Sequence, residues 1–469
     1  MSPRSLAALL FLIGGPRAIA SPPSAEPGEE LSGGTTTVVQ NGQNAFSLPL
    51  ANISRENRRA HVVGNSFFNK NWVVAPASPA ARDGLGPLFN AHSCSGCHVR
   101  DGRGSLPREN GSSGLLFRLS VPGEKVQKGN VTVHSPPVPH PIYGGQLGVL
   151  AIPGAQPEGT VSINYQEIEG KFADGSTYTL RSPVYQLIPS KSYSAPETDL
   201  MISPRLAPPV HGLGLLEAVA ESEILAHSDP DDEDGDGISG RPNRAWNAER
   251  KQYELGRFGW KANQTDLRQQ TASAFLSDIG ITSRIHPRED LTDSQFEQLD
   301  KLLLGEYPEL SDQILDRVVR YQQTLAPPAR RNWEDPIVVK GKALFESAQC
   351  SACHLPTMKT APDYSEVPEL ANQTIRPYTD LLLHDMGEAL SDHCPDFEAR
   401  GHEWRTPPLW GIGLTEAVNG NTFFLHDGRA RSLEEAILWH GGEAEASAYF
   451  YRGLPKADRD ALLAFLNSL

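Results

Sequence analysis

Two kinds of periodicity divide the sequence. Between residues 115 and 190, glycine-rich turns separate short segments in which apolar and polar residues alternate, as they do in half-buried β-strands. Residues 115–119, 131–134, 161–165 and 178–180 carry this pattern most clearly. Because the alanine- and leucine-rich spacing of helices is almost absent there, the pattern predicts a β-rich insertion.

Helical spacing of apolar residues marks residues 293–323 and the C-terminal region. Ser432 and Glu435 are spaced as a capping box, which predicts a helix that runs to His440 and ends at a Gly-Gly pair. A last amphipathic helix is predicted over residues 456–469, because Leu462, Phe465, Leu466 and Leu469 fall on one stripe.

One five-residue motif occurs twice, as CSGCH at residues 94–98 and as CSACH at residues 350–354. Two thiols one helical turn apart can form thioethers to one porphyrin, while the adjacent imidazole binds its iron. A zinc knuckle would need four ligands at each site, and a thioredoxin-like redox pair needs no histidine. The motif therefore predicts two covalently bound c-type haems, held by Cys94, Cys97 and His98 and by Cys350, Cys353 and His354.

Both motifs belong to longer repeats. Leu-Phe precedes each motif by the same interval, and the segment R-x-x-P-P-V-x-G-L-G-L-x-E-A-V, which begins at Arg205, has a near copy that begins at Arg405. We therefore expect a mainly α fold of two tandem cytochrome c-like lobes, with the β-rich insertion in the first lobe. The expected boundaries are 1–20 for a signal peptide, 21–114 for the N-terminal part of the first lobe, 115–190 for the insertion, 191–325 for the rest of that lobe and an interlobe region, and 326–469 for the second lobe.

The N-terminal residues have the features of a secretory signal. Arg4 precedes an apolar core at residues 6–13, and Ala18-Ile19-Ala20 forms an A-x-A-like cleavage site. Since bacteria attach c-type haem after export, the signal and the haem motifs together predict the periplasm. No later apolar run is long enough for a membrane helix, so no stable membrane span is expected.

Charge and cysteine content narrow the possible partners. The formal net charge is -15, which argues against nucleic acid as a partner. Four of the five cysteines belong to the haem motifs, so no disulfide framework is expected. The remaining Cys394 is expected to be a buried, inert thiol rather than a reactive one.

An acidic loop follows the first Pro-Pro-Gly repeat. Asp232, Asp234, Asp236 and Gly237 match the first half of an EF-hand loop, in which alternate carboxylates converge on one Ca²⁺ ion. Position twelve would be Asn243 instead of the usual bidentate glutamate, so the match is partial. We expect a calcium site in this loop, and a solvated acidic turn is the alternative.

Five longer segments resemble one known family. They are ARDGLGPLFNAHSCSGCHVRDGRG at 81–104, DPDDEDGDGISGR at 229–241, GRFGWKANQ at 256–264, PYTDLLLHDMG at 377–387 and FLHDGRARSLEEAILWHGGEA at 424–444. Together they resemble the dihaem oxidoreductase family, which is described both as peroxidases and as thiol oxidoreductases and belongs to the dihaem cytochrome c peroxidase superfamily. The resemblance covers almost the whole mature chain.

The resemblance implies axial ligands for the second haem. In dihaem peroxidases a His-x-Gly turn is followed, fourteen residues after its histidine, by the distal methionine of the C-terminal haem. Here the turn begins at His426, and the residue fourteen positions later is His440. The second haem would then have His354 and His440 as ligands, which should lower its potential relative to a His/Met haem. Met386 is the rival ligand.

The first haem departs from the family pattern. Those peroxidases commonly have a distal histidine about sixteen residues after the haem histidine, where this chain has Gly114. An open position for peroxide is therefore expected at the first haem, unless His134, His140 or Tyr143 from the insertion supplies a ligand. Glu217 is the candidate acid-base group, with Arg205 as a charge stabiliser, and both could instead be structural. Trp246 or Trp260 could bridge the haems.

These interpretations predict a periplasmic dihaem c-type cytochrome oxidoreductase that reduces hydrogen peroxide or another small oxidant at the first haem. Electrons would enter at the second haem from a periplasmic donor protein, either a small cytochrome c or a cupredoxin. Two alternatives stay open. The protein could be a non-enzymatic electron carrier, or it could oxidise a thiol or a protein side chain.

Overall fold

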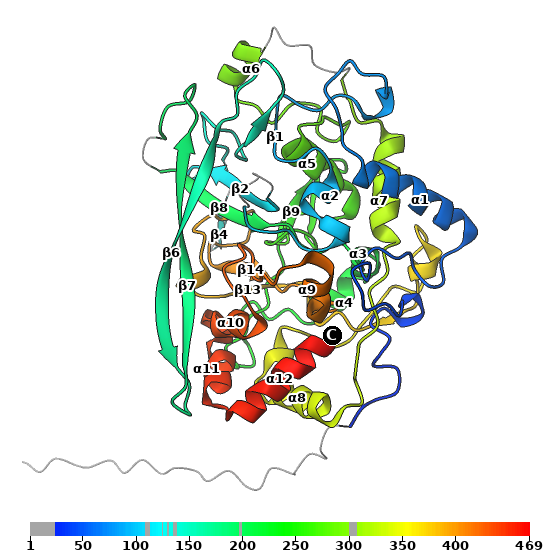
Figure 1. Ribbon diagram of the computed structural model, residues 1–469, viewed down its shortest axis with the longest axis vertical. Helices are drawn as coiled ribbons and strands as arrows, with labels where there is room; N and C mark the ends of the chain where they lie inside the picture. The colour runs from blue at the N-terminus through cyan, green and yellow to red at the C-terminus, as the bar shows by residue number, and fades with distance from the viewer. Residues whose placement is uncertain are drawn as a thin grey trace, which may run out of the picture.

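Two pairs of crossed helices frame the two haem motifs. The computed structural model describes residues 24–107, 113–123, 125–128, 131–134, 138–196, 199–299 and 307–469. Helix α1 (Arg55–Asn69) packs against α7 (Asp312–Gln323), and α8 (Pro336–Ser347) packs against α12 (Lys456–Ser468) (Figure 1). The first motif forms the short helix α2 (Cys94–Cys97). The expected signal peptide lies outside the described residues.

A glycine sits at each of these helix crossings. A Cβ on Gly64 of α1 would lie 2.0 Å from the Arg317 carbonyl oxygen of α7, and a Cβ on Gly341 of α8 would lie 2.0 Å from the Ala461 carbonyl oxygen of α12. Only glycine allows the two backbones to approach this closely. The two halves of the chain therefore share a packing solution that the sequence repeats did not reveal.

Each Pro-Pro-Gly repeat packs against the C-terminal end of one of these helices, the first repeat against α7 and the second against α12. Gly212 and Gly411 have φ values of 74° and 76°, the left-handed conformation that glycine adopts without strain. A Cβ on Gly214 would lie 2.1 Å from the Gln323 carbonyl oxygen, and one on Gly413 would lie 2.2 Å from the Asn467 carbonyl oxygen. In each copy, the first glycine therefore allows a turn, and the second allows the backbone to lie close to the end of a helix.

Strands occur in all four segments in which they were expected, but they are longer in three of them and also occur elsewhere. The described strands form seven two-stranded antiparallel sheets. Their pairs are β1 (Leu88–Phe89) with β5 (Leu150–Ala151), β2 (Leu115–Ser120) with β8 (Met201–Leu206), β3 (Lys125–Lys128) with β4 (Val131–His134), β6 (Gly159–Lys171) with β7 (Thr177–Pro189), β9 (Arg244–Asn247) with β10 (Gln252–Leu255), β11 (Met358–Lys359) with β12 (Thr374–Ile375), and β13 (Leu383–Asp385) with β14 (Glu403–Arg405).

The expectation of a mainly α fold is wrong. The structure is 31% helical and 20% strand, so it is a mixed fold with several small sheets. Strands of two to four residues, such as those of the β9–β10 and β13–β14 pairs, are too short to show alternation in the sequence. The remaining helices are α5 (Leu267–Ile279), which is as long as α12, and the shorter α3 (Leu213–Glu217), α4 (Glu221–Leu225), α6 (Asp293–Leu299), α9 (Thr415–Asn419), α10 (Leu433–Leu438) and α11 (Glu445–Gly453).

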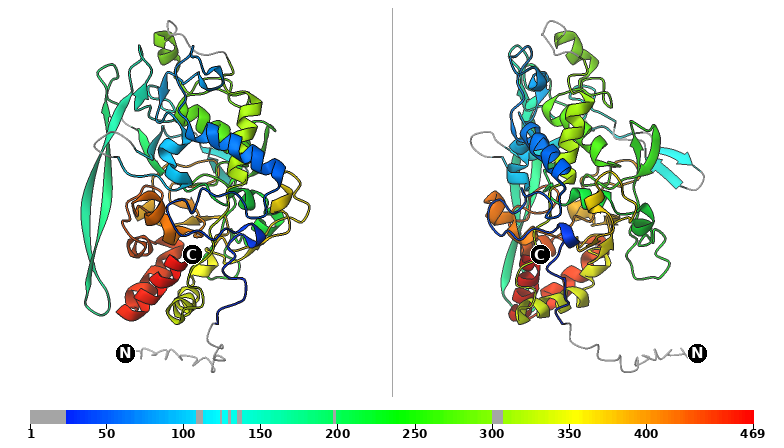
Figure 2. Two further views of the ribbon diagram at one scale, coloured as in Figure 1. Left: turned by 45° about the vertical axis from the view of Figure 1, so that its right-hand side comes forward. Right: turned by 90° about the vertical axis from the view of Figure 1, so that its right-hand side faces the viewer.

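The long β6–β7 hairpin runs along one side of the molecule, beside α10 and α11 (Figures 1 and 2). Phe172 near its tip packs in one hydrophobic cluster with Tyr451 and Phe465 of the C-terminal helices. Conversely, Met358 and Leu370 of the second half of the chain belong to the same hydrophobic core as Phe68 of α1 in the first half. The two halves of the chain therefore contribute to each other's cores.

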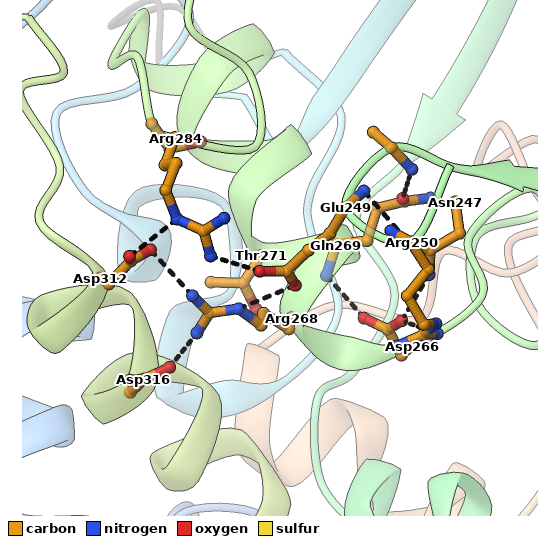
Figure 3. Close-up of polar contacts among 12 residues, drawn as sticks. Asn247, Glu249, Arg250, Asp266, Arg268, Gln269, Thr271, Arg284, Asp312 and Asp316 are labelled. Carbon is orange, nitrogen blue, oxygen red and sulfur yellow. Dashed lines mark hydrogen bonds and ion pairs between the residues drawn. The ribbon is translucent and has the colours of Figure 1, made fainter. Parts of the chain in front are cut away.

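A network of ion pairs joins α5 to α7 and to the loop after β9 (Figure 3). Arg268 of α5 contacts Asp312 of α7 at 2.8 Å and Glu249 at 3.1 Å, and Arg284 contacts Asp312 at 2.9 Å. Asp316 of α7 also pairs with Arg268. Because these groups are largely exposed, the network orients the helices more than it stabilises the fold.

Within the described residues, no helix combines the length and the apolar character that crossing a membrane requires.

We predict that Gly341→Ala will lower the free energy of unfolding by about 1–3 kcal/mol, because the added methyl group forces α8 away from α12. Urea unfolding followed by circular dichroism measures this change. Gly453→Ala is the matched control, since nothing lies within 4 Å of its Cβ position at the end of α11. Equal stability of the Gly341 variant and the control would show that the crossing is not tightly packed.

Candidate functional site

The second motif lies on a cavity of about 160 Å³. Cys350, Cys353 and His354 line it together with His440 and Met386. Its walls are mostly apolar and aromatic, and they come from both halves of the chain, since Arg103 and Trp260 also reach it. A cavity of this kind suits a large, flat, apolar cofactor that carries a few polar groups.

The histidines at the two motifs are all held in the same way. The Nδ1 atom of His354 lies 2.9 Å from the Tyr378 carbonyl oxygen, that of His440 lies 2.7 Å from the Ala436 carbonyl oxygen, and that of His98 lies 2.7 Å from the Pro208 carbonyl oxygen. A carbonyl can only accept, so Nδ1 carries the proton and Nε2 keeps its lone pair for a metal. Burial lowers the pKa of His354 to about 4 and also lowers those of His98 and His440, so the rings are neutral.

The arrangement brings His354 and His440 together in one cavity. The proximity of His440 contributes to the low pKa of His354, after burial. His440 follows α10, whose N-terminus is capped by Ser432 as expected, although the helix ends two residues before His440. Met386 lines the same cavity and packs beside Leu390, Phe424 and Trp439, so both ligand candidates stay near the second motif.

His384 lines the cavity, but both of its ring nitrogens are bonded to carboxylates. Its Nε2 lies 2.7 Å from Asp380, and its Nδ1 lies 2.6 Å from Glu443. Although burial acts to lower it, these carboxylates raise the pKa of His384 well above its ordinary value. With both nitrogens engaged, the ring has no lone pair for iron. It instead places a positive charge beside Cys353, whose sulfur lies 3.4 Å from Nδ1.

Two buried polar groups face the cavity without a protein partner. Among the described residues, none bonds to Nε or Nη1 of Arg103, which is only 7% exposed, or to Nε2 of His426. Buried polar groups are almost always paired, so an acceptor from a bound molecule is expected here. The carboxylates of haem propionates have the required charge, and these residues therefore fit a haem. Sequence analysis missed Arg103 because it lies in the first motif's segment.

The aromatic wall beside His426 is ordered by stacking. The Trp404 ring lies parallel to His426 with centroids 3.7 Å apart, and the Lys261 ammonium lies 4.3 Å from the same indole. Trp260 is buried in the wall and donates through Nε1 to the Leu206 carbonyl oxygen at 2.7 Å. Trp246, the other expected bridge, is 39% exposed in β9 and packs on Tyr253.

The first motif lies in a tight, apolar setting. Phe68 approaches the His98 ring with centroids 6.2 Å apart. A Cβ on Gly114 would lie 2.5 Å from the Gly104 Cα atom and 3.1 Å from the Cys97 carbonyl oxygen, so this backbone leaves no room for a histidine at position 114. His140 is buried against Tyr143, whose hydroxyl donates to the Ser194 carbonyl oxygen. The side chain of His134 lies outside the described residues.

A buried acid that sequence analysis missed lies three residues after His98. Asp101 accepts a hydrogen bond from the Tyr321 hydroxyl at 2.8 Å. Burial raises the pKa of Asp101 to about 6, although Ser47 and Tyr321 act against this shift. A carboxyl group that titrates in this range is suited to proton transfer.

The two expected catalytic residues lie apart. Glu217 accepts hydrogen bonds from the Leu267 backbone at 2.8 Å, from Gln323 at 2.7 Å and from Tyr364 at 3.0 Å, and burial raises its pKa. These partners position α5 and α7, and none belongs to a haem motif. Arg205 pairs with Asp392 at 3.3 Å and lies over the Trp404 ring at 4.9 Å, and so it lies beside the second cavity.

The cysteine thiols are all protonated. Burial raises the pKa values of Cys94, Cys97 and Cys350 to about 12 and also raises that of Cys353. A buried, protonated thiol is a poor nucleophile for disulfide exchange. Cys394 is 4% exposed and has its pKa raised to about 12 by burial, so it lacks the access and ionisation of a reactive cysteine.

The acidic loop gathers a different set of carboxylates from the expected one. Oxygens of Asp229, Asp232 and Asp234 lie within 4.8 Å of one another, whereas Asp236 is not in this group. Gly237 has the expected positive φ of 84°. Asn243 is buried, and its amide nitrogen donates to the carbonyl oxygens of Lys261 and Asp396.

A family model described as "Di-haem oxidoreductase, putative peroxidase" matches residues 28–469. The chain belongs to this family. The resemblance seen in the sequence is thereby confirmed, and membership of a di-haem oxidoreductase family implies two haems. No curated protein matches the chain.

Among solved structures, a hydrazine synthase from Kuenenia stuttgartiensis is similar at 13% identity, covering 97% of this chain and 100% of its own. Its TM-score is 0.28, which is too low to support any argument about fold or function.

Arg103→Met should lower the midpoint potential of the haem at the second motif by on the order of 50 mV, because a nearby positive charge stabilises the reduced state. Spectroelectrochemical titration measures the shift. Arg103→Lys is the control, since it keeps the charge and should restore most of the potential. An unchanged potential in the methionine variant would mean that Arg103 does not face the cofactor.

Proposed function

We propose that this protein is an exported, periplasmic di-haem c-type oxidoreductase that reduces hydrogen peroxide at the first motif. Electrons reach that site through the second motif. The observation that carries the proposal is the asymmetry of the two sites. In the second cavity His354 and His440 bond to carbonyls through Nδ1, which leaves Nε2 to bind a metal, whereas Gly114 stands at the first motif where related peroxidases have a distal histidine and its packing admits no side chain.

The chain's own residues determine how each haem is held. Cys94 and Cys97, or Cys350 and Cys353, would form the thioethers, with His98 and His354 as proximal ligands. When bound, each haem supplies one-electron chemistry at its iron. His440, with Met386 as its rival, would close the second iron to small ligands.

Charge and proton control follow from the surrounding side chains. Arg103 and His426 would receive propionates, and His384 keeps a positive charge near Cys353. At the first motif, Asp101 can hold a proton near neutral pH and exchange it with Tyr321. This role was expected of Glu217, which the three bonds that it accepts favour as a positioning residue.

Trp260 is the preferred bridge between the sites. It lines the second cavity beside Arg103, whose own segment begins at the first motif. The net charge of -15 favours a donor protein with a basic face, such as a small cytochrome c or a cupredoxin. The carboxylates at Asp229, Asp232 and Asp234 would bind Ca²⁺ and steady the loop that bonds to Glu443 through Ser239.

Haem-loaded protein should consume hydrogen peroxide when a reduced dye supplies electrons. Cys394→Ser should keep full turnover, because this thiol is buried and protonated. Stopped-flow oxidation of the dye measures both. Loss of activity in the serine variant would favour a thiol mechanism, and the absence of turnover with two six-coordinate irons would favour a simple electron carrier.

A further inference from the structure

The β6–β7 hairpin is fastened to the turn that forms one wall of the second cavity. Arg181 of β7 donates through Nε to the Arg429 carbonyl oxygen at 3.0 Å and through Nη2 to the Gly428 carbonyl oxygen at 3.4 Å. The hydroxyl of Tyr185, also in β7, donates to Asp427 at 2.9 Å. The hairpin therefore holds a phenol directly behind the cavity wall.

A continuous series of contacts leads from the cavity to this phenol. Trp404 and His426 both line the cavity and stack on each other at 3.7 Å. His426 Nε2 lies 3.8 Å from the buried carboxylate of Asp427, which accepts the Tyr185 hydrogen bond. Aromatic rings in contact are good stepping points for single electrons, because each step crosses only a short gap.

The series continues to the surface. In the β6–β7 ladder Tyr165 lies opposite Pro183, so Tyr165 and Tyr185 are diagonal neighbours on one face of the hairpin. Tyr165 is 36% exposed, and the Arg181 guanidinium packs over its ring at 4.3 Å. A molecule too large for the cavity can therefore reach one end of the series.

The charges around Tyr185 suit proton-coupled electron loss. A phenol gives up an electron readily only if its proton leaves at the same time. Burial raises the pKa of Tyr185, so the resting side chain keeps its proton. Arg429 donates through Nε to Asp427 at 2.8 Å and keeps this buried carboxylate ionised, so it can accept the Tyr185 proton across the 2.9 Å hydrogen bond.

We propose that Tyr185, Asp427 and Tyr165 form a relay that passes single electrons from phenolic reductants at the surface to the second cavity. This proposal rests on the proposed reduction of peroxide. Each peroxide reduced at the first motif withdraws two electrons through the second cavity, and Tyr185 replaces them one at a time, giving its proton to Asp427 at each step. Tyr165 then reduces the Tyr185 radical by giving it an electron and a proton. A phenol at the surface reduces the Tyr165 radical in the same way. Hydrogen peroxide takes two electrons and two protons to form two waters, so each peroxide oxidises two phenols to phenoxyl radicals.

Another phenol in the cavity provides a matched control. Tyr451 lines the cavity and bonds to the Glu434 carboxylate at 2.9 Å, but it is completely buried and its ring contacts the buried Phe172 instead of the Tyr185 series. Tyr143 bonds to a backbone carbonyl and lies outside the series. Tyr185→Phe, Tyr451→Phe and Tyr143→Phe each remove one hydroxyl and keep the ring.

The test uses haem-loaded protein mixed with one equivalent of hydrogen peroxide and no reductant. Freeze-quench electron paramagnetic resonance counts tyrosyl radicals, and peptide mapping with the spin trap 2-methyl-2-nitrosopropane locates adducts at Tyr165. The wild-type protein should give a tyrosyl signal and a Tyr165 adduct. Tyr185→Phe should reduce both at least fivefold, whereas Tyr451→Phe and Tyr143→Phe should keep them.

The outcomes separate the relay from the peroxide activity. Peroxide consumption without a tyrosyl radical, or with equal radical yields in wild type and Tyr185→Phe, would overturn the relay and leave the proposed function standing. A radical lost only in Tyr451→Phe would place the oxidised residue elsewhere and would also overturn it. If the wild-type protein consumes no peroxide even with a reduced dye, both proposals fail.

Discussion

The hydrogen bond from each candidate ligand histidine to a backbone carbonyl is the interaction on which the arrangement of the sites depends. It fixes the tautomer and the ring plane, and it ties a short motif to a segment far away in the sequence, as His98 is tied to Pro208. Pro208 belongs to the Pro-Pro-Gly repeat, whose glycines dock on the end of α7. The helix crossing and the docked repeat recur in both halves of the chain, whereas His354 of the second motif is tied to Tyr378, which lies before its repeat.

The side chains that surround the two motifs differ. At the second motif, the segment after α10 brings His440 into the cavity, and the Trp260 ring and two cations surround Trp404 and His426. At the first motif, Gly114 packs against Gly104, and Asp101 is buried beside Tyr321. In the proposed function, the first site transfers protons through a titratable acid and the second site passes electrons to it.

The sequence predicted the family better than the fold. Cys-x-x-Cys-His spacing is local, so the motifs could be recognised directly, and the capped helix start at Ser432 was also a local signal, although the helix ends before His440. Short strands such as β13 and β14 are stabilised by tertiary pairing and leave no periodic signal, which is why the mainly α expectation failed. Arg103 reaches a cavity formed more than two hundred residues later in the chain, and no spacing in the sequence could reveal that contact.

The most direct measurement of this account is the electron paramagnetic resonance spectrum of the resting, fully oxidised protein, compared with that of His440→Ala. The account predicts one low-spin haem and one high-spin haem in the wild-type protein, with the low-spin signal converted to high spin in the variant. Two low-spin haems in the resting protein, or a low-spin signal that survives the loss of His440, would contradict the proposed division of labour between the sites.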